Sequence, residues 1–160
     1  MGMLAVYAGV PSGLADRLGD VEPDDAVEYV ESVLEDGAPS VDIDKAWDGL
    51  HYLLTGVSAS EPIEDDALSE AVVGVYAFES DDLVGVTPTD DLARILEALD
   101  AVDIDALLRA ADFTAFTAAQ IYPESWSQQQ TDWLRDAFTQ IVDIHRLCAA
   151  DGLDLLVSIY

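Results

Sequence analysis

The sequence predicts a single α/β domain, or its α+β variant, in which a small mixed sheet with N- and C-terminal strands is packed by about five to six helices. Three observations support this prediction. The chain has 160 residues, which suits one domain spanning residues 1–160. Hydrophobic residues make up 51% of it, enough for a core. Stretches of β-forming residues open and close the chain, and amphipathic patterns fill most of the sequence between them.

Strands are predicted at both ends and near the middle. Met3 to Val10 is rich in β-forming residues, and so is the closing segment Leu153 to Tyr160. Between them, Ala67 to Phe78 predicts a short helical turn, a break at Gly74 and then a strand. A further short strand is predicted from Leu83 to Val86.

Helices are predicted where apolar residues recur at spacings of three and four. The segments are 12–18, 24–36, 42–55, a helix capped by Thr87 or Thr89, a helix capped by Asp103 that reaches Ala111, and 128–150. Phe113 to Trp126 is predicted to be a turn or loop with buried aromatic residues, because Pro123 prevents a helix from continuing near Tyr122.

The charge of the chain excludes two classes of partner. Thirty-three acidic residues face six basic ones, giving a formal net charge of −27. A nucleic-acid binder needs a lysine and arginine surface that neutralises phosphates, and binding to an anionic membrane needs the same. We therefore expect neither partner.

Two explanations of the acidity remain open. An acidic, lysine-poor surface suits a salt-loaded cytoplasm, where the repulsion is screened. The other explanation is a specific acidic face that binds a cationic partner. Since the acids are spread over nearly every segment, the sequence favours halophilic adaptation.

Halophilic adaptation predicts that the protein is less stable in low salt, because the repulsion is then unscreened. The melting temperature should rise between low and multimolar KCl. A melting temperature that stays flat over this range would contradict the prediction.

Compartment and chemistry are constrained by what the sequence lacks. One cysteine, Cys148, cannot form an internal disulfide, and the segment MGMLAVYAGV has no positive leader and is too short and glycine-interrupted to cross a bilayer. We therefore expect a soluble cytoplasmic protein. There is no glycine-rich phosphate loop, GxSxG turn, CxxC pair or HExxH motif, so no metal or cofactor is predicted. The oligomeric state stays open.

The segment DIDKAWDGLHYLLTG reads as a helix that Asp42 caps and Gly56 ends. On it, His51 lies one turn from Asp48 and two turns from Asp44. The three side chains could converge as an acid/base unit or as metal ligands. In so acidic a chain a solvated helix face is the favoured interpretation.

Lys45 is the only lysine, and it lies in this same segment. One ammonium retained in such a composition predicts a fixed anion beside it. A buried carboxylate of the fold is the favoured partner, and the acidic group of a ligand is the alternative.

The remaining aromatic and histidine residues are predicted first as core. His145 lies on the apolar face of the last helix, and Trp47, Trp126 and Trp133 are core candidates. Tyr122, before a proline, is the aromatic most expected to leave the core for a functional surface.

The MGM start, the DIDKAWDGLHYLLTG segment, IYPESW and the closing helix and strand together resemble the YfbM-like family of uncharacterised bacterial and archaeal domains. The central pattern falls on Asp42, Ile43, Asp44, Lys45, Trp47, Leu50, His51, Leu54, Thr55 and Gly56. The resemblance implies a small α/β domain and no established activity. This sequence departs from the family pattern at Val75, where the family often carries an acidic residue. The resemblance implies that Lys45 is retained in this lysine-poor chain because it belongs to the family motif.

The sequence favours a non-catalytic module that binds a small molecule or protein through five residues: Asp44, Lys45, Trp47, His51 and Tyr122. The alternative is an enzyme, a hydrolase or transferase that uses His51 as acid/base with Asp44 or Asp48. A third possibility, an acidic decoy that neutralises a cationic partner, depends on charge alone.

Overall fold

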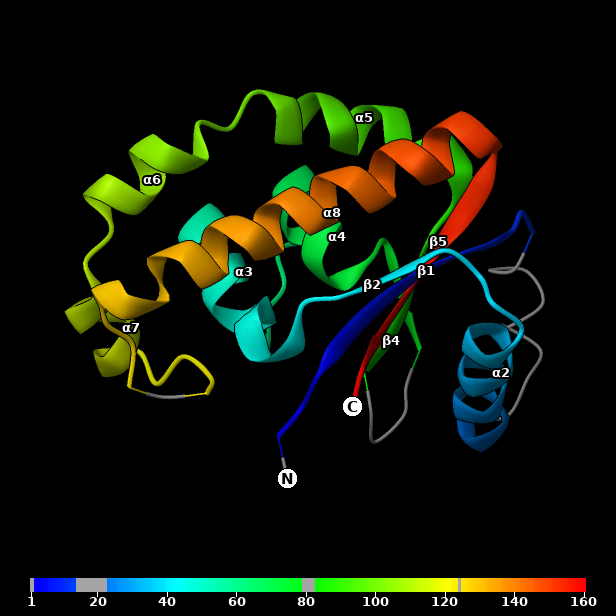
Figure 1. Ribbon diagram of the computed structural model, residues 1–160, viewed down its shortest axis with the longest axis horizontal. Coiled ribbons are helices and arrows are strands. Elements are labelled where there is room, and N and C mark those ends of the chain that lie inside the picture. The colour runs from blue at the N-terminus through cyan, green and yellow to red at the C-terminus, as the bar shows by residue number, and fades with distance from the viewer. Residues whose placement is uncertain (1, 14–22, 79–82, 124) are drawn as a thin grey trace.

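Five strands form one sheet at the centre of the computed structural model, which describes residues 2–13, 23–78, 83–123 and 125–160 (Figure 1). The strand order is β2-β1-β5-β4-β3. The strands are β1 (Ala5–Pro11), β2 (Ser40–Asp42), β3 (Tyr76–Phe78), β4 (Leu83–Thr87) and β5 (Leu153–Ile159). Each described pairing is antiparallel. The α/β class is confirmed, and the sheet is antiparallel rather than mixed.

Seven α-helices lie in the described part of the chain. They are α2 (Pro23–Glu35), α3 (Trp47–Thr55), α4 (Ala67–Val73), α5 (Thr89–Asp100), α6 (Ile104–Ala110), α7 (Phe113–Ala118) and α8 (Thr131–Asp151), with short 3-10 turns at Asp44–Ala46 and Gln128–Gln130. The helix predicted over 12–18 falls largely outside the described residues. The loop predicted from Phe113 is wrong at its start, because Asp112 caps α7 by accepting a hydrogen bond from the Thr114 amide.

Helices α3 to α8 cover one face of the sheet, and α2 lies against the other (Figure 1). The alternation of strand residues explains both layers. Tyr7, Leu155 and Val157 point into the large core under α3 to α8. Val10 and Leu156, on the opposite face, pack against a smaller cluster that includes residues of α2. Both faces of the sheet are therefore buried, which is why β1 and β5 are mostly apolar in sequence instead of alternating with polar residues.

The start of α5 is fixed by a hydrogen bond to a residue of strand β5. The sequence predicts Thr87 or Thr89 as its cap, but neither side chain caps the helix. Instead the amide of Thr89 donates to Asp154, a buried carboxylate at the start of β5, over 2.9 Å. The other oxygen of Asp154 accepts from Gly13. A residue distant in sequence thus replaces the expected local cap.

His145 and Cys148 of α8 lie in the core, and for His145 this confirms the prediction. His145 is fully buried; its Nδ1 donates to the Ile141 carbonyl, and Nε2 has no hydrogen-bond partner among the described residues. Burial lowers the pKa of His145 to about 4. Burial also raises the pKa of the Cys148 thiol to about 11, so this thiol is protonated at neutral pH.

The two ends of the described chain pair with each other. Leu4 and Tyr160 exchange two backbone hydrogen bonds of 2.6 and 3.0 Å, which extend the pairing of β1 with β5. None of the described helices combines the length and the apolar character needed to cross a bilayer.

Gly49 of α3 makes room for the indole ring of Trp126. A Cβ at position 49 would lie 2.1 Å from the nearest ring carbon. That ring cannot withdraw, because it is buried, stacks on Trp133 and donates its N–H to the Ile121 carbonyl. The absence of a side chain at position 49 is therefore a packing requirement.

Replacing Gly49 with alanine should lower the free energy of unfolding by about 1 to 3 kcal/mol, because overpacking outweighs the gain in helix propensity. Chemical denaturation of the variant measures the change. The loss should shrink in a Trp126→Phe background, where the smaller ring leaves space. Equal losses in both backgrounds would contradict the steric explanation.

Candidate functional site

The motif segment folds as a 3-10 turn, Asp44–Ala46, that runs directly into α3. Asp42 belongs to β2, and its carboxylate accepts from the amide of Asp44 over 2.7 Å. Asp44 is exposed and has a positive φ of 54°, a conformation that a short polar side chain tolerates better than most. Gly56 ends α3 with a φ of 84°, as predicted.

Asp48 joins three separate segments. One carboxylate oxygen accepts from the hydroxyl of Ser58 at 2.8 Å and the amide of Ala59 at 2.7 Å. The other accepts from the amide of Tyr122 at 2.8 Å. The side chain is only 4% exposed. Asp48 therefore anchors the loop after α3 and the loop after α7, and its oxygens are used within the fold.

His51 is fully buried and bonded on both ring nitrogens. Nδ1 donates to the Val57 carbonyl over 2.8 Å, and this partner, which can only accept, fixes the tautomer. Nε2 then accepts the hydroxyl proton of Ser69 over 2.7 Å. Burial is the largest effect on His51 and lowers its pKa, so the ring is neutral near pH 7.

Trp47 and Tyr122 clamp the segment that leads into β1. Their rings stack with centroids 5.3 Å apart. The indole N–H of Trp47 donates to the Met3 carbonyl over 2.9 Å, and the Tyr122 hydroxyl accepts from the Met3 amide over 2.7 Å. Tyr122 is half-buried, so it leaves the core only in part.

Lys45 is half-buried beside the same clamp. A Cβ built on Gly2 would lie 2.6 Å from its ammonium nitrogen and 3.0 Å from the Tyr122 hydroxyl. The favoured expectation was a buried carboxylate as its partner. Among residues 2–13, 23–78, 83–123 and 125–160 no carboxylate forms an ion pair with Lys45. The expected pair is therefore not found there.

The five predicted ligand residues divide into two groups. Lys45, Trp47 and Tyr122 come together near the start of the chain, while His51 is buried in its own hydrogen bonds and Asp44 points to solvent. The acid/base unit predicted from spacing does not form, since the hydrogen bonds of His51 and Asp48 go to other residues and Asp44 is exposed. The reason is that His51 and Asp48 have hydrogen-bond partners on other segments, whereas the Asp44 side chain is exposed. Within the described residues, no three His, Cys, Asp or Glu side chains are grouped to hold a metal ion.

Ser69 is the residue that the sequence analysis missed. It lies on α4, 18 residues from His51, and its hydroxyl oxygen also accepts from the Ile63 amide over 2.9 Å. Helical spacing cannot reveal a partner on another helix. The only local signal was the SEAVVG segment itself, in which Asp66 caps α4 by accepting from the Ser69 amide.

Comparison with known proteins agrees with the resemblance seen in the motif. A profile of the family described as "Domain of unknown function (DUF1877)" matches residues 1–158. Protein YfbM of Escherichia coli (strain K12) is 32% identical over 125 residues, which cover 77% of this chain and 74% of YfbM. The crystal structure of YfbM, a protein of unknown function from Escherichia coli, matches with a TM-score of 0.80 and 26% identity, over 98% of this chain and 99% of that chain. The chain belongs to the DUF1877 family, whose function is unknown.

Proposed function

We propose that the protein is a non-catalytic binding module that holds a carboxylate of a small molecule or protein between Lys45 and Tyr122. The observation that carries the proposal is the Lys45 ammonium, which has no ion pair within the described part of a chain of net charge −27. Nearby acids are abundant, so an ammonium left without one is available to a ligand.

The groups around Lys45 supply the remaining donors. The Tyr122 hydroxyl accepts from the Met3 amide and keeps its own proton to donate. The stack on Trp47 holds the tyrosine ring in place. Both polar atoms lie within 3.0 Å of where a Gly2 side chain would start, so glycine at this position keeps the space beside them clear.

A carboxylate suits this place better than a phosphate dianion. Every negative charge on a ligand is repelled by the acidic surface, and the repulsion grows with ligand charge. A singly charged group incurs the smaller penalty and still pairs with one ammonium. Multimolar salt weakens the repulsion further.

The proposal predicts that Lys45 is dispensable for folding. Lys45→Met should change the melting temperature in multimolar KCl by less than about 2 °C, since no buried carboxylate loses its partner. A drop of about 6 °C or more would instead show a folding role and contradict the proposal.

Ligand binding can be followed at the Met3 amide by NMR, because this amide is bonded to Tyr122. Replacing KCl with potassium acetate at constant ionic strength should shift its resonance saturably. Lys45→Met should abolish the shift. Arg109→Met, which removes an exposed cation from α6, should preserve it. No shift, or equal shifts in both variants, would overturn the proposal.

The Ser69 and His51 pair is the one observation that favours the catalytic alternative, in a changed form. A hydroxyl bonded to a neutral imidazole is the arrangement of an activated nucleophile: its proton would pass to Nε2 as oxygen attacks an ester carbonyl and displaces the alcohol, and water would release the acyl group. Against this, both side chains are fully buried and the serine oxygen already accepts from Ile63.

A fluorophosphonate probe separates the two functions. The binding proposal predicts no covalent label. Labelling that disappears in Ser69→Ala would favour the hydrolase instead. The retention of folding by Ser69→Ala should be checked by circular dichroism, because Ser69 connects α4 to Ile63 and His51.

A further inference from the structure

A pocket of about 430 Å³ lies beside the edge strand β3, and Ser69, the hydrogen-bond partner of His51, is among its lining residues. Its walls come from the loop at residues 62–65, from α4 and from residues 75–77. The volume is in the range of pockets that hold small molecules.

The walls of this pocket are mainly apolar and unusually exposed. Pro62, Ile63, Val73 and Val75 contribute aliphatic surface, and Tyr76 contributes an aromatic ring to the lining. Ile63 is 38% exposed and Tyr76 is 54% exposed, and they are two of the five large hydrophobic side chains left exposed in the described part of the chain. Such side chains gathered at one concave place indicate a binding surface.

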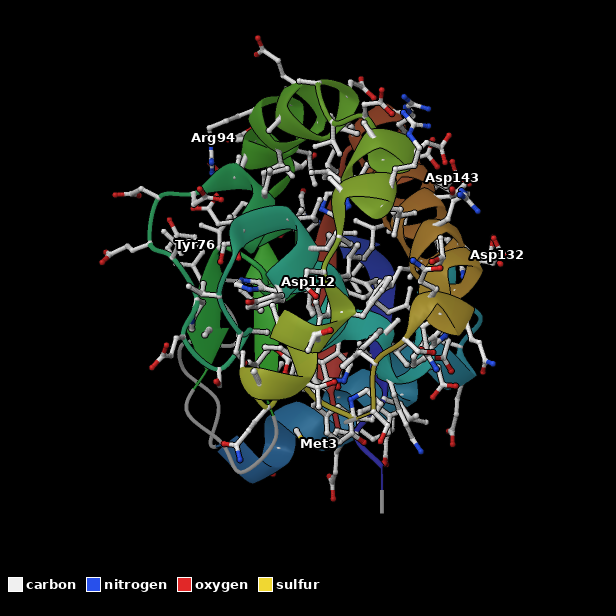
Figure 2. The ribbon with its side chains drawn as sticks, turned by 90° about the vertical axis from the view of Figure 1, so that its left-hand side faces the viewer. Met3, Tyr76, Arg94, Asp112, Asp132 and Asp143 are labelled. Atoms are coloured by element: carbon white, nitrogen blue, oxygen red, sulfur yellow. The ribbon has the colours of Figure 1, made fainter. Side chains whose placement is uncertain are left out.

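The charged residues that line the pocket in the described part of the chain are all acidic. They are Glu64, Asp65 and Glu70. Glu70 is 7% exposed and forms an ion pair of 2.7 Å with Arg94. Arg94 is itself shared with Asp91, so one guanidinium pairs with both carboxylates. Figure 2 shows Tyr76 and Arg94 on the same side of the molecule.

We propose that this pocket binds a small organic cation of the alkylammonium class. The acids set the sign of the ligand charge, and Tyr76 can face the cation with its ring. The aliphatic walls decide between classes of cation. A hydrated potassium ion would have to exchange water for hydrocarbon there, whereas an alkylammonium ion presents methyl or methylene groups to the same walls.

This combination distinguishes the pocket from the general acidity of the surface. Acids spread over the chain attract any counterion without discrimination, and salt screens that attraction. A cation held against an aromatic ring and aliphatic walls, with the carboxylates of Glu64 and Asp65 in the same lining, should survive screening, because its contacts are short and partly desolvated. The inference does not depend on the proposed carboxylate site at Lys45.

Choline and its uncharged isostere 3,3-dimethylbutan-1-ol are the probes that test the inference. Titration calorimetry in multimolar KCl should show saturable binding of choline and at least fivefold weaker binding of the alcohol. Tyr76→Leu should weaken choline binding about fivefold to tenfold, while Tyr76→Phe should retain it, since the ring face is what matters. Tyr160→Leu, which alters another exposed tyrosine, should have no effect.

Three results would overturn the inference: no choline binding, equal binding of the alcohol, or equal weakening by Tyr76→Leu and Tyr160→Leu. Because Tyr76 is exposed, its variants should fold normally. Lys45→Met should leave choline binding unchanged, so failure of this inference and failure of the carboxylate proposal are distinguishable.

Discussion

Replacing Asp48 with alanine should lower the melting temperature by about 6 to 20 °C in multimolar KCl. The substitution leaves two backbone amides and the Ser58 hydroxyl without the carboxylate that now accepts from them. Stranding several partly buried donors costs about 3 to 5 kcal/mol in the free energy of unfolding. At about 2 to 4 °C per kcal/mol for a chain of this size, the stated range follows.

Two further variants make the Asp48 result specific. Asp48→Asn keeps the shape but loses one accepting oxygen, so it should fall between wild type and Asp48→Ala. Asp143→Ala, which removes an exposed acid from α8, should change stability by less than about 0.5 kcal/mol. If Asp48→Ala behaved like Asp143→Ala, the carboxylate would not be anchoring the two loops.

Acidification should destabilise the protein through His145 by about 3 kcal/mol between pH 6.5 and pH 4. In the unfolded chain a histidine takes up its proton near pH 6.5, whereas burial lowers the pKa of folded His145 to about 4. The unfolded state therefore binds more protons in this window, and stability falls as pH falls. Above about pH 7.5 this residue contributes almost no pH dependence, because its unfolded form is then also neutral.

The His145 contribution can be isolated by comparing His145→Leu with wild type in chemical denaturation at several pH values. Carboxylates titrate in both proteins, so only the difference between the two curves reports His145. The plots of unfolding free energy against pH for the two proteins should converge or cross as pH falls. His145→Gln is a second variant in case the leucine packs poorly. Parallel curves from pH 7 to pH 4 would contradict the assignment.

Much of the fold is predictable because its longer strands and helices follow from local patterns of apolar and polar residues. The strands at Met3 to Val10 and Leu153 to Tyr160 correspond to β1 and β5, and the final predicted helix corresponds to α8 with its preceding 3-10 turn. Asp103 caps α6 as expected. Long periodic segments bury a whole face, so their pattern is strong enough to read without neighbours.

Short elements were missed where the deciding contact is distant. β2 has three residues and exists because it pairs with β1, which no local pattern reveals. The six residues of α7 were obscured by Pro123, although that proline lies beyond the end of the helix. A short element depends on tertiary packing more than on its own propensity.

For the candidate site, the sequence by itself determined which residues are present: one lysine, two histidines and a motif shared with the DUF1877 family. It also determined that His145 would be core. Only the tertiary structure decided the partners, joining Asp48 to Tyr122 across 74 positions and His51 to Ser69 on another helix, and leaving Lys45 without a carboxylate among the described residues. The physical reason is that helical spacing defines which side chains share a face, whereas hydrogen-bond partners depend on which segments the packed core brings within 3 Å of one another.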